Sequence, residues 1–114
     1  LKRFPQSQHA PLVRYTRAQC LFELERWSEA AVGFAEIGKL HPNFSHAPES
    51  RFREGEARYR GGELDLAFTS LRAFVEQHGD SYLLEPALFL SAEAAFRTSR
   101  FAEAETAYRR YLEA

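Results

Sequence analysis

The chain repeats its own sequence pattern with a period of 37 residues. Ala30, Ala67 and Ala104 mark the register, because each lies 37 positions beyond the one before. Five further columns keep similar residues in that register: Tyr15/Phe52/Phe89, Ala18/Gly55/Ala92, Phe22/Tyr59/Phe96, Trp27/Leu64/Phe101 and Phe34/Leu71/Tyr108. Chance would not align so many columns over two periods, so a repeat array is the first inference about the fold.

Each unit of the repeat reads as two helices joined by a short turn. In the middle unit, Pro48 opens a stretch to residue 60, Gly61-Gly62 interrupts it, and a second stretch covers residues 64–78. Proline suits the first position of a helix, and glycine tolerates the left-handed geometry of a helix stop. No segment alternates apolar and polar residues as a half-buried strand would. The pattern therefore predicts an all-α chain.

The same layout covers the rest of the sequence. We expect helices at residues 12–24 and 28–40, with Pro11 as the first helical position, and at residues 86–99 and 101–114. The three helix–turn–helix units then occupy residues 4–40, 41–77 and 78–114, and residues 1–3 match the end of a preceding repeat. Together they form one continuous α-solenoid domain, which we expect to belong to a longer array.

Composition excludes several classes of function. A net charge of −1 gives no electrostatic reason to expect nucleic acid or an anionic membrane as a partner. No apolar tract approaches the roughly 18 residues of a membrane-spanning helix. Cys20 is the single cysteine, so no internal disulfide can form. Because it shares the column of Ala57 and Ala94, we interpret it as a small packing residue rather than a redox thiol or metal ligand.

This repeat pattern resembles that of the tetratricopeptide repeat (TPR) family. That family has a small residue in the first helix (helix A), Ala-x3-aromatic in the second (helix B), and proline eight residues on. Ala30-x3-Phe34 followed by Pro42 fits this pattern completely, while Ala67-x3-Leu71 and Ala104-x3-Tyr108 fit with exchanges. Helix A departs from the usual Leu-Gly and tyrosine of the family. The resemblance implies the fold and a role in binding proteins.

The linkers carry a second, looser resemblance. Phe4-Pro5-Gln6-Ser7 and Gly79-Asp80-Ser81 are similar to linkers in the longer repeats of bacterial envelope proteins, namely Tol–Pal coordination proteins and outer-membrane assembly lipoproteins. This resemblance implies a periplasmic or outer-membrane-associated scaffold. Similar repeats occur in bacterial motility, polarity and secretion scaffolds, so those settings stay open.

The TPR resemblance also implies that helix A lines a concave groove that binds a partner peptide or helix. Its expected contact residues are Tyr15, Gln19, Phe52, Glu56, Tyr59, Arg60, Phe89, Glu93, Phe96 and Arg97. Two alternatives remain for them. The aromatic rings can pack one helix A against the next, and the charged side chains can form a merely solvated face with local pairing.

No catalytic, cofactor or metal site is expected. The sequence has no glycine-rich phosphate loop, nucleophile elbow or paired-histidine motif. His9 and His46 are repeat equivalents, as are His41 and His78, so duplication explains their placement. No cysteine or carboxylate cluster accompanies them at the spacing of zinc ligands. We therefore predict a protein that is not an enzyme.

Two further hypotheses complete the sequence reading. The last helix carries Tyr108, Tyr111 and Leu112, which would allow self-association through an uncapped end. The whole segment could instead be a structural spacer, or a regulatory region of a larger protein, with no ligand in its groove. Exposure of the aromatic columns separates a spacer from a binding module.

Overall fold

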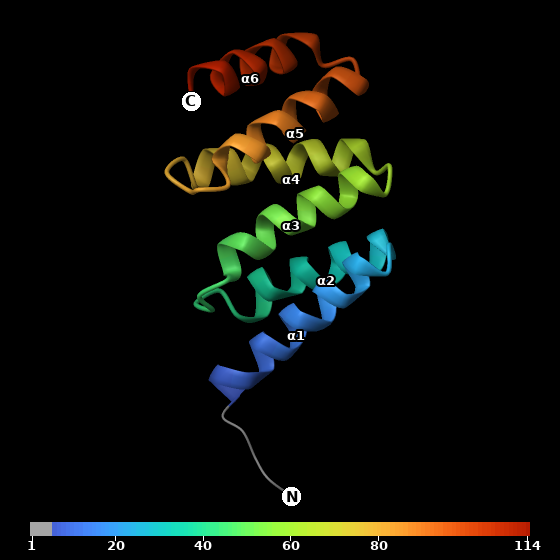
Figure 1. Ribbon diagram of the computed structural model, residues 1–114, viewed down its shortest axis with the longest axis vertical. Coiled ribbons are helices and arrows are strands. Elements are labelled where there is room, and N and C mark those ends of the chain that lie inside the picture. The colour runs from blue at the N-terminus through green and yellow to red at the C-terminus, as the bar shows by residue number, and fades with distance from the viewer. Residues whose placement is uncertain (1–5) are drawn as a thin grey trace, which may run out of the picture.

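The computed structural model describes residues 6–114, with side chains from His9 onward, and every regular element in that range is an α-helix. The helices are α1 (Gln6–Glu23), α2 (Trp27–Leu40), α3 (Ala47–Arg60), α4 (Leu64–Gln77), α5 (Leu84–Arg97) and α6 (Phe101–Glu113). Figure 1 shows them stacked in chain order, with the direction of the chain reversing from each helix to the next. The predicted all-α class is confirmed for the described range.

The helix starts follow the register of the sequence. Helices α2, α4 and α6 begin at positions 27, 64 and 101, and α3 and α5 begin at positions 47 and 84. Helix α1 differs from the prediction, because it begins at Gln6 and encloses Pro11. Proline cannot donate the helical hydrogen bond at that position. Its side chain is fully buried, however, and this packing offsets the lost bond. The predicted end of a preceding repeat, residues 1–3, lies outside the described residues.

The turn inside each helical pair has one geometry, repeated three times. Glu25, Gly62 and Ser99 have φ values of 62°, 83° and 64°, which is left-handed backbone. The next residue then donates its amide proton to a carbonyl five residues back, over 2.9, 2.8 and 2.7 Å. This is the Schellman arrangement that ends many helices. Only the middle turn uses the expected glycine, so the tertiary fold imposes the geometry on Glu25 and Ser99.

The small residues of the repeat lie where helices approach closely. Ala30 and Ala67 are fully buried and Ala104 nearly so, as their register predicted. Gly55 on α3 faces Leu71 on α4, where a methyl group would not fit. Consecutive helices pack against one another, and α3 also contacts α5. Each helical pair is therefore stabilised by its neighbours, as in a solenoid.

The sequence reading was wrong about Cys20. Its thiol is exposed and free, although the equivalent Ala57 and Ala94 are fully buried. Ala57 packs with the residues of α1 and α2, so its burial comes from a neighbouring pair. No described helix covers the corresponding face of α1. A residue's place in a small-residue column therefore predicts the direction in which its side chain points. It does not predict whether another helix covers that side chain.

Candidate functional site

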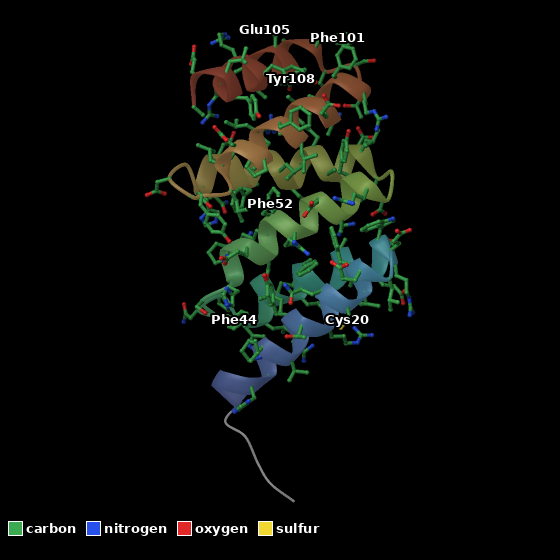
Figure 2. All side chains as sticks on the ribbon, in the orientation of Figure 1. Cys20, Phe44, Phe52, Phe101, Glu105 and Tyr108 are labelled. Carbon is green, nitrogen blue, oxygen red and sulfur yellow. The ribbon has the colours of Figure 1, made fainter. Side chains whose placement is uncertain are left out.

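The first aromatic column of helix A runs from packed to exposed along the chain. Tyr15 packs edge-on against Phe34, with ring centroids 5.8 Å apart, and stacks on His46 at 5.3 Å. Phe52 is 5% exposed and packs on Phe74 in the core, where Figure 2 labels it among the central helices. The prediction that Phe52 contacts a partner is therefore wrong, because a buried ring cannot reach one.

Phe89 is the third member of that column and the exposed one. Its side chain is 43% exposed and lies 5.9 Å from the ring of Tyr111. Phe96 lies about two turns further along α5, at i+7. It is 57% exposed and packs edge-on against Phe101. Residues at this spacing share one face of a helix. The structure therefore presents two apolar rings side by side on α5.

The column of Phe22 and Tyr59 is used for contacts between helical pairs. Phe22 is buried beneath the guanidinium of Arg53, which lies 4.4 Å from its ring centroid. Tyr59 is half-buried, and Arg97 lies 5.7 Å above its ring. A guanidinium over an aromatic face is an attractive arrangement. One alternative from the sequence was that these aromatic rings pack neighbouring units together. Phe22 has that role fully because it is buried, and half-buried Tyr59 has it in part.

The polar residues predicted for the groove mostly contact each other. Glu93 accepts hydrogen bonds from Tyr108 at 2.7 Å and from Tyr59 at 3.5 Å. Figure 2 shows Tyr108 between α6 and α5. Burial, followed by the hydrogen bond to Glu93, raises the pKa of Tyr108 to about 12. These bonds connect three helices and fix the carboxylate of Glu93 in place.

Glu56 and Arg60 are fixed in a similar way. Glu56 pairs with Arg53 at 3.8 Å and with Arg60 at 3.6 Å. Arg60 also lies over the rings of Phe22 and Trp27, at 5.4 and 5.5 Å from their centroids. Arg60 covers the ring of Phe22 in the preceding unit as Arg97 covers the ring of Tyr59, so the two arginines are equivalent in structure as well as in register.

Gln19 lies apart from this group. It is half-buried and borders a shallow hollow on α1, which also contains Cys20, Glu23 and Leu24. The predicted polar residues of α3 and α5 fall into two groups: Glu56 pairs with Arg60, whereas Glu93 contacts Tyr59, over whose ring Arg97 lies. Four of the predicted residues are exposed: Arg60, Phe89, Phe96 and Arg97.

Sequence reasoning missed a second concave feature, a pocket of about 270 Å³ where α4, α5 and α6 meet. Its walls are mostly apolar, and charged side chains of α4 and α6 stand at its edge. The signal in the sequence was the replacement of the large polar residues Glu54 and Arg58 by Ser91 and Ala95 at fixed positions of the repeat. That signal is visible only once the contacts of the equivalent residues are known.

Across residues 6–114 no group of three or more His, Cys, Asp or Glu side chains could hold a metal ion. Over the same span, none of the helices is long and apolar enough to cross a membrane.

Comparison with known families gives one match. Residues 49–81, which cover most of α3, all of α4 and the following turn, match the tetratricopeptide repeat family. No curated protein matches the sequence significantly. The match supports a TPR-family repeat in the middle of the chain. Repeats of this family generally mediate protein–protein interaction.

Proposed function

We propose that this chain is an array of three TPR-like repeats with a 37-residue period that binds a peptide or helix of a partner protein on its helix A face. The family match at residues 49–81 is the observation that carries the proposal. The recurrence of the helix starts and of the three left-handed turn residues supports its extension to the flanking units. The proposal includes no catalytic step, cofactor or metal.

The contact surface that we propose is centred on α5. Phe89 and Phe96 offer two exposed rings on one face, and Arg97 adds an exposed cation beside them. An amphipathic helix laid along this face would bury an apolar stripe on the rings and place an acidic residue near Arg97. Glu93 belongs to the same helix, and the surface extends along α1 and α3 through Tyr15, Gln19, Glu56, Tyr59 and Arg60.

The proposed setting is a bacterial envelope or motility complex. This part rests only on the similarity of the linkers at residues 4–7 and 79–81, and it would favour a periplasmic or outer-membrane-associated location. Self-association through Tyr108, Tyr111 and Leu112 is compatible with it, since Leu112 is 82% exposed.

A pull-down with a matched control tests the helix A face. The wild-type chain, Phe89→Ala/Phe96→Ala and Val32→Ala/Leu66→Ala would be compared on a lysate of the source organism. Val32 and Leu66 are exposed to a similar degree but lie on helices B. Far-UV circular dichroism would show that all three proteins are folded.

The outcomes separate the hypotheses. A partner retained by the wild type and the helix B variant, but lost by the helix A variant, supports the proposal. Loss from the helix B variant alone would move the site to the other face. A partner held equally by all three proteins, or no partner, would favour the structural spacer.

A further inference from the structure

The pocket between α4, α5 and α6 lies on the helix B side of the stack, away from the exposed rings of α5. Phe68 and Val75 of α4 and Leu88 of α5 form its apolar walls, and Ala102 and Ala107 of α6 lie opposite. At about 270 Å³ it has room for one large side chain. None of these residues belongs to the proposed helix A surface.

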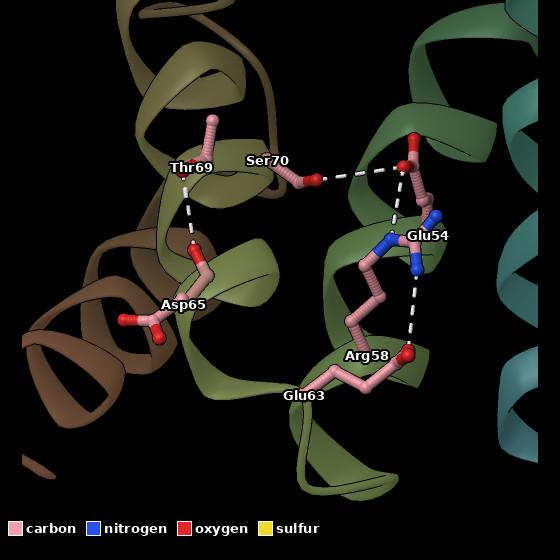
Figure 3. A network of polar contacts seen from close by, with 6 residues as sticks. All are labelled: Glu54, Arg58, Glu63, Asp65, Thr69 and Ser70. Atoms are coloured by element: carbon pink, nitrogen blue, oxygen red, sulfur yellow. Dashed lines mark hydrogen bonds and ion pairs between the residues drawn. The ribbon is translucent and has the colours of Figure 1, made fainter. Parts of the chain in front are cut away.

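The corresponding place in the preceding helical pair is closed by a polar network. Figure 3 shows Glu54 of α3 accepting hydrogen bonds from Ser70 of α4 and from Arg58. The two distances are 3.5 and 3.2 Å. Arg58 donates in turn to Glu63, also at 3.2 Å. These side chains bridge the two helices and fill the space between them.

The third pair lacks every part of that bridge. The residues 37 positions beyond Glu54, Arg58 and Ser70 are Ser91, Ala95 and Ala107. A hydroxymethyl group and two methyl groups replace a carboxylate, a guanidinium and a hydroxyl, so the space stays open. The first pair differs again, because Arg17 and Glu36 make its equivalent hollow polar. An apolar pocket is therefore specific to the third pair.

Two further substitutions change the chemical character of the pocket wall. Leu88 stands 37 positions beyond Arg51, whose guanidinium lies against Gly38 of α2. Val75 stands at the position of Gly38, so an arginine–glycine contact in one unit becomes a leucine–valine contact in the next. The wall of the pocket changes from charged to apolar as a result.

Ser91 adds a polar group to this apolar site. Its side chain is 4% exposed and borders the pocket, and within residues 9–114 its hydroxyl has no hydrogen-bond partner. Ser50, the other buried serine, donates to the carbonyl of His46 at 2.9 Å. The hydroxyl oxygen of Ser91 is open to the pocket, and a ligand that covered it without a hydrogen bond would leave a buried group unpaired, which is unfavourable. Ser91 is thus available to a polar atom at the end of an otherwise apolar ligand group.

The edge of the pocket carries both signs of charge. Arg72 is paired with Glu103 at 4.0 Å and lies over the ring of Phe68. Arg110 and Glu76 are exposed and, within the described part of the chain, form no ion pair or hydrogen bond. An incoming segment can therefore gain one charge contact with each of them, which would set its orientation.

We propose that this pocket is a second docking site, which takes a tyrosine side chain from a segment of a partner protein. Tyrosine combines an apolar ring, which suits the walls, with a hydroxyl that needs a partner when buried, and Ser91 provides that partner. An acidic residue of the segment contacts Arg110 and a basic one contacts Glu76. Phenylalanine would leave the hydroxyl of Ser91 unpaired, so the site prefers tyrosine.

Titration followed by NMR of backbone amides tests the site with defined probes. These are p-cresol, toluene and the acetylated, amidated tripeptides Asp-Tyr-Lys, Lys-Tyr-Asp and Asp-Phe-Lys. We expect saturable shifts at Leu88, Ser91 and Ala107 with p-cresol, at least tenfold weaker binding of toluene, and tighter binding of one tyrosine peptide than of p-cresol. The phenylalanine peptide should bind about tenfold more weakly than its tyrosine counterpart.

Variants assign the effect to the pocket. Ser91→Ala should remove the preference for p-cresol over toluene, whereas Ser50→Ala, a buried serine elsewhere, should keep it. Ser91→Glu/Ala107→Ser restores the glutamate–serine contact of the preceding pair, fills the pocket with the larger side chain and should abolish binding of every probe. Arg110→Glu should weaken the preferred peptide by several fold and leave p-cresol unchanged.

Three results would overturn the proposal. Shifts of these amides could be absent at millimolar p-cresol and peptide, or toluene could bind as tightly as p-cresol. The peptides could also bind no more tightly than p-cresol, which would make the pocket a site for a small phenolic molecule instead of a partner protein. Phe89→Ala/Phe96→Ala should leave every titration unchanged, so failure on one face is distinct from failure on the other.

Discussion

Gly55 lies at a close approach of α3 to Leu71 of α4, and adding one methyl group there tests the packing of the solenoid. A Cβ atom at Gly55 would lie 2.6 Å from Cγ and 2.7 Å from Cδ2 of Leu71. Contacts this short require atoms to move. Leu71 is completely buried, so its side chain has little room to turn aside.

The size of the effect follows from two opposing contributions. Replacing glycine by alanine inside a helix normally stabilises a protein by about 0.5–1 kcal/mol. Overpacking a core contact costs about 1–3 kcal/mol. For Gly55→Ala the second should exceed the first and leave a net loss near 1 kcal/mol. In a chain of this size that lowers the melting temperature by roughly 4 °C.

Gly38→Ala is the matched control on α2. A Cβ atom there would meet only the guanidinium of Arg51, at 3.5 Å or more. That is ordinary contact, so only the helical preference of alanine should remain. We expect a gain of about 0.5–1 kcal/mol in the free energy of unfolding. One chemical change should thus act with opposite signs at two sites.

Chemical unfolding followed by far-UV circular dichroism would measure both variants. A Leu71→Ala background adds a decisive comparison, because the clash disappears with the leucine. Gly55→Ala should then be neutral or stabilising relative to Leu71→Ala alone. If Gly55→Ala stabilised the otherwise wild-type chain as Gly38→Ala does, the expected clash with Leu71 would be contradicted.

Three further predictions concern single side chains. Tyr108 should ionise near pH 12 instead of near the ordinary value of about 10, so the stability that its raised pKa contributes is fully present below pH 10 and is lost as the pH rises to about 12. A pH titration of tyrosinate absorbance would show this ionisation. The tyrosine that ionises at the highest pH should do so at lower pH in Glu93→Gln, and an unchanged titration would contradict its assignment to Tyr108. Ser99→Gly should raise the free energy of unfolding by up to about 1 kcal/mol, because glycine removes the strain of left-handed backbone; urea unfolding showing a loss would exclude this. Cys20 should react with a maleimide in the folded state at close to the rate of the urea-unfolded chain, and strong protection would show that it is covered.

Most of the fold could be predicted from the sequence, because helix position is a local property. The columns of alanines, aromatics and turn residues report which side of each helix is buried and where it stops. Five of the six helices in the described range start within two residues of the predicted positions. Helix α1 was the exception. Pro11 was predicted to be its first residue, but the helix begins at Gln6 and the buried ring of Pro11 lies inside it.

The candidate site was less predictable, because it depends on contacts between units. Phe52 and Phe89 share one column, and yet the first is buried and the second is 43% exposed. Glu93 was expected in a groove, and the structure gives it two tyrosine hydroxyls as partners. Each outcome was set by residues far away in the sequence.

The sequence by itself determined the period, the helices, the turns and the face of each helix that turns inward. Only the tertiary structure decided which members of a column are covered, which charges are already paired, and where the replacement of Glu54 and Ser70 by Ser91 and Ala107 leaves an open pocket. The physical reason is that periodicity fixes the direction of a side chain from its own backbone. Burial and pairing are fixed by whatever neighbouring helix arrives on that side.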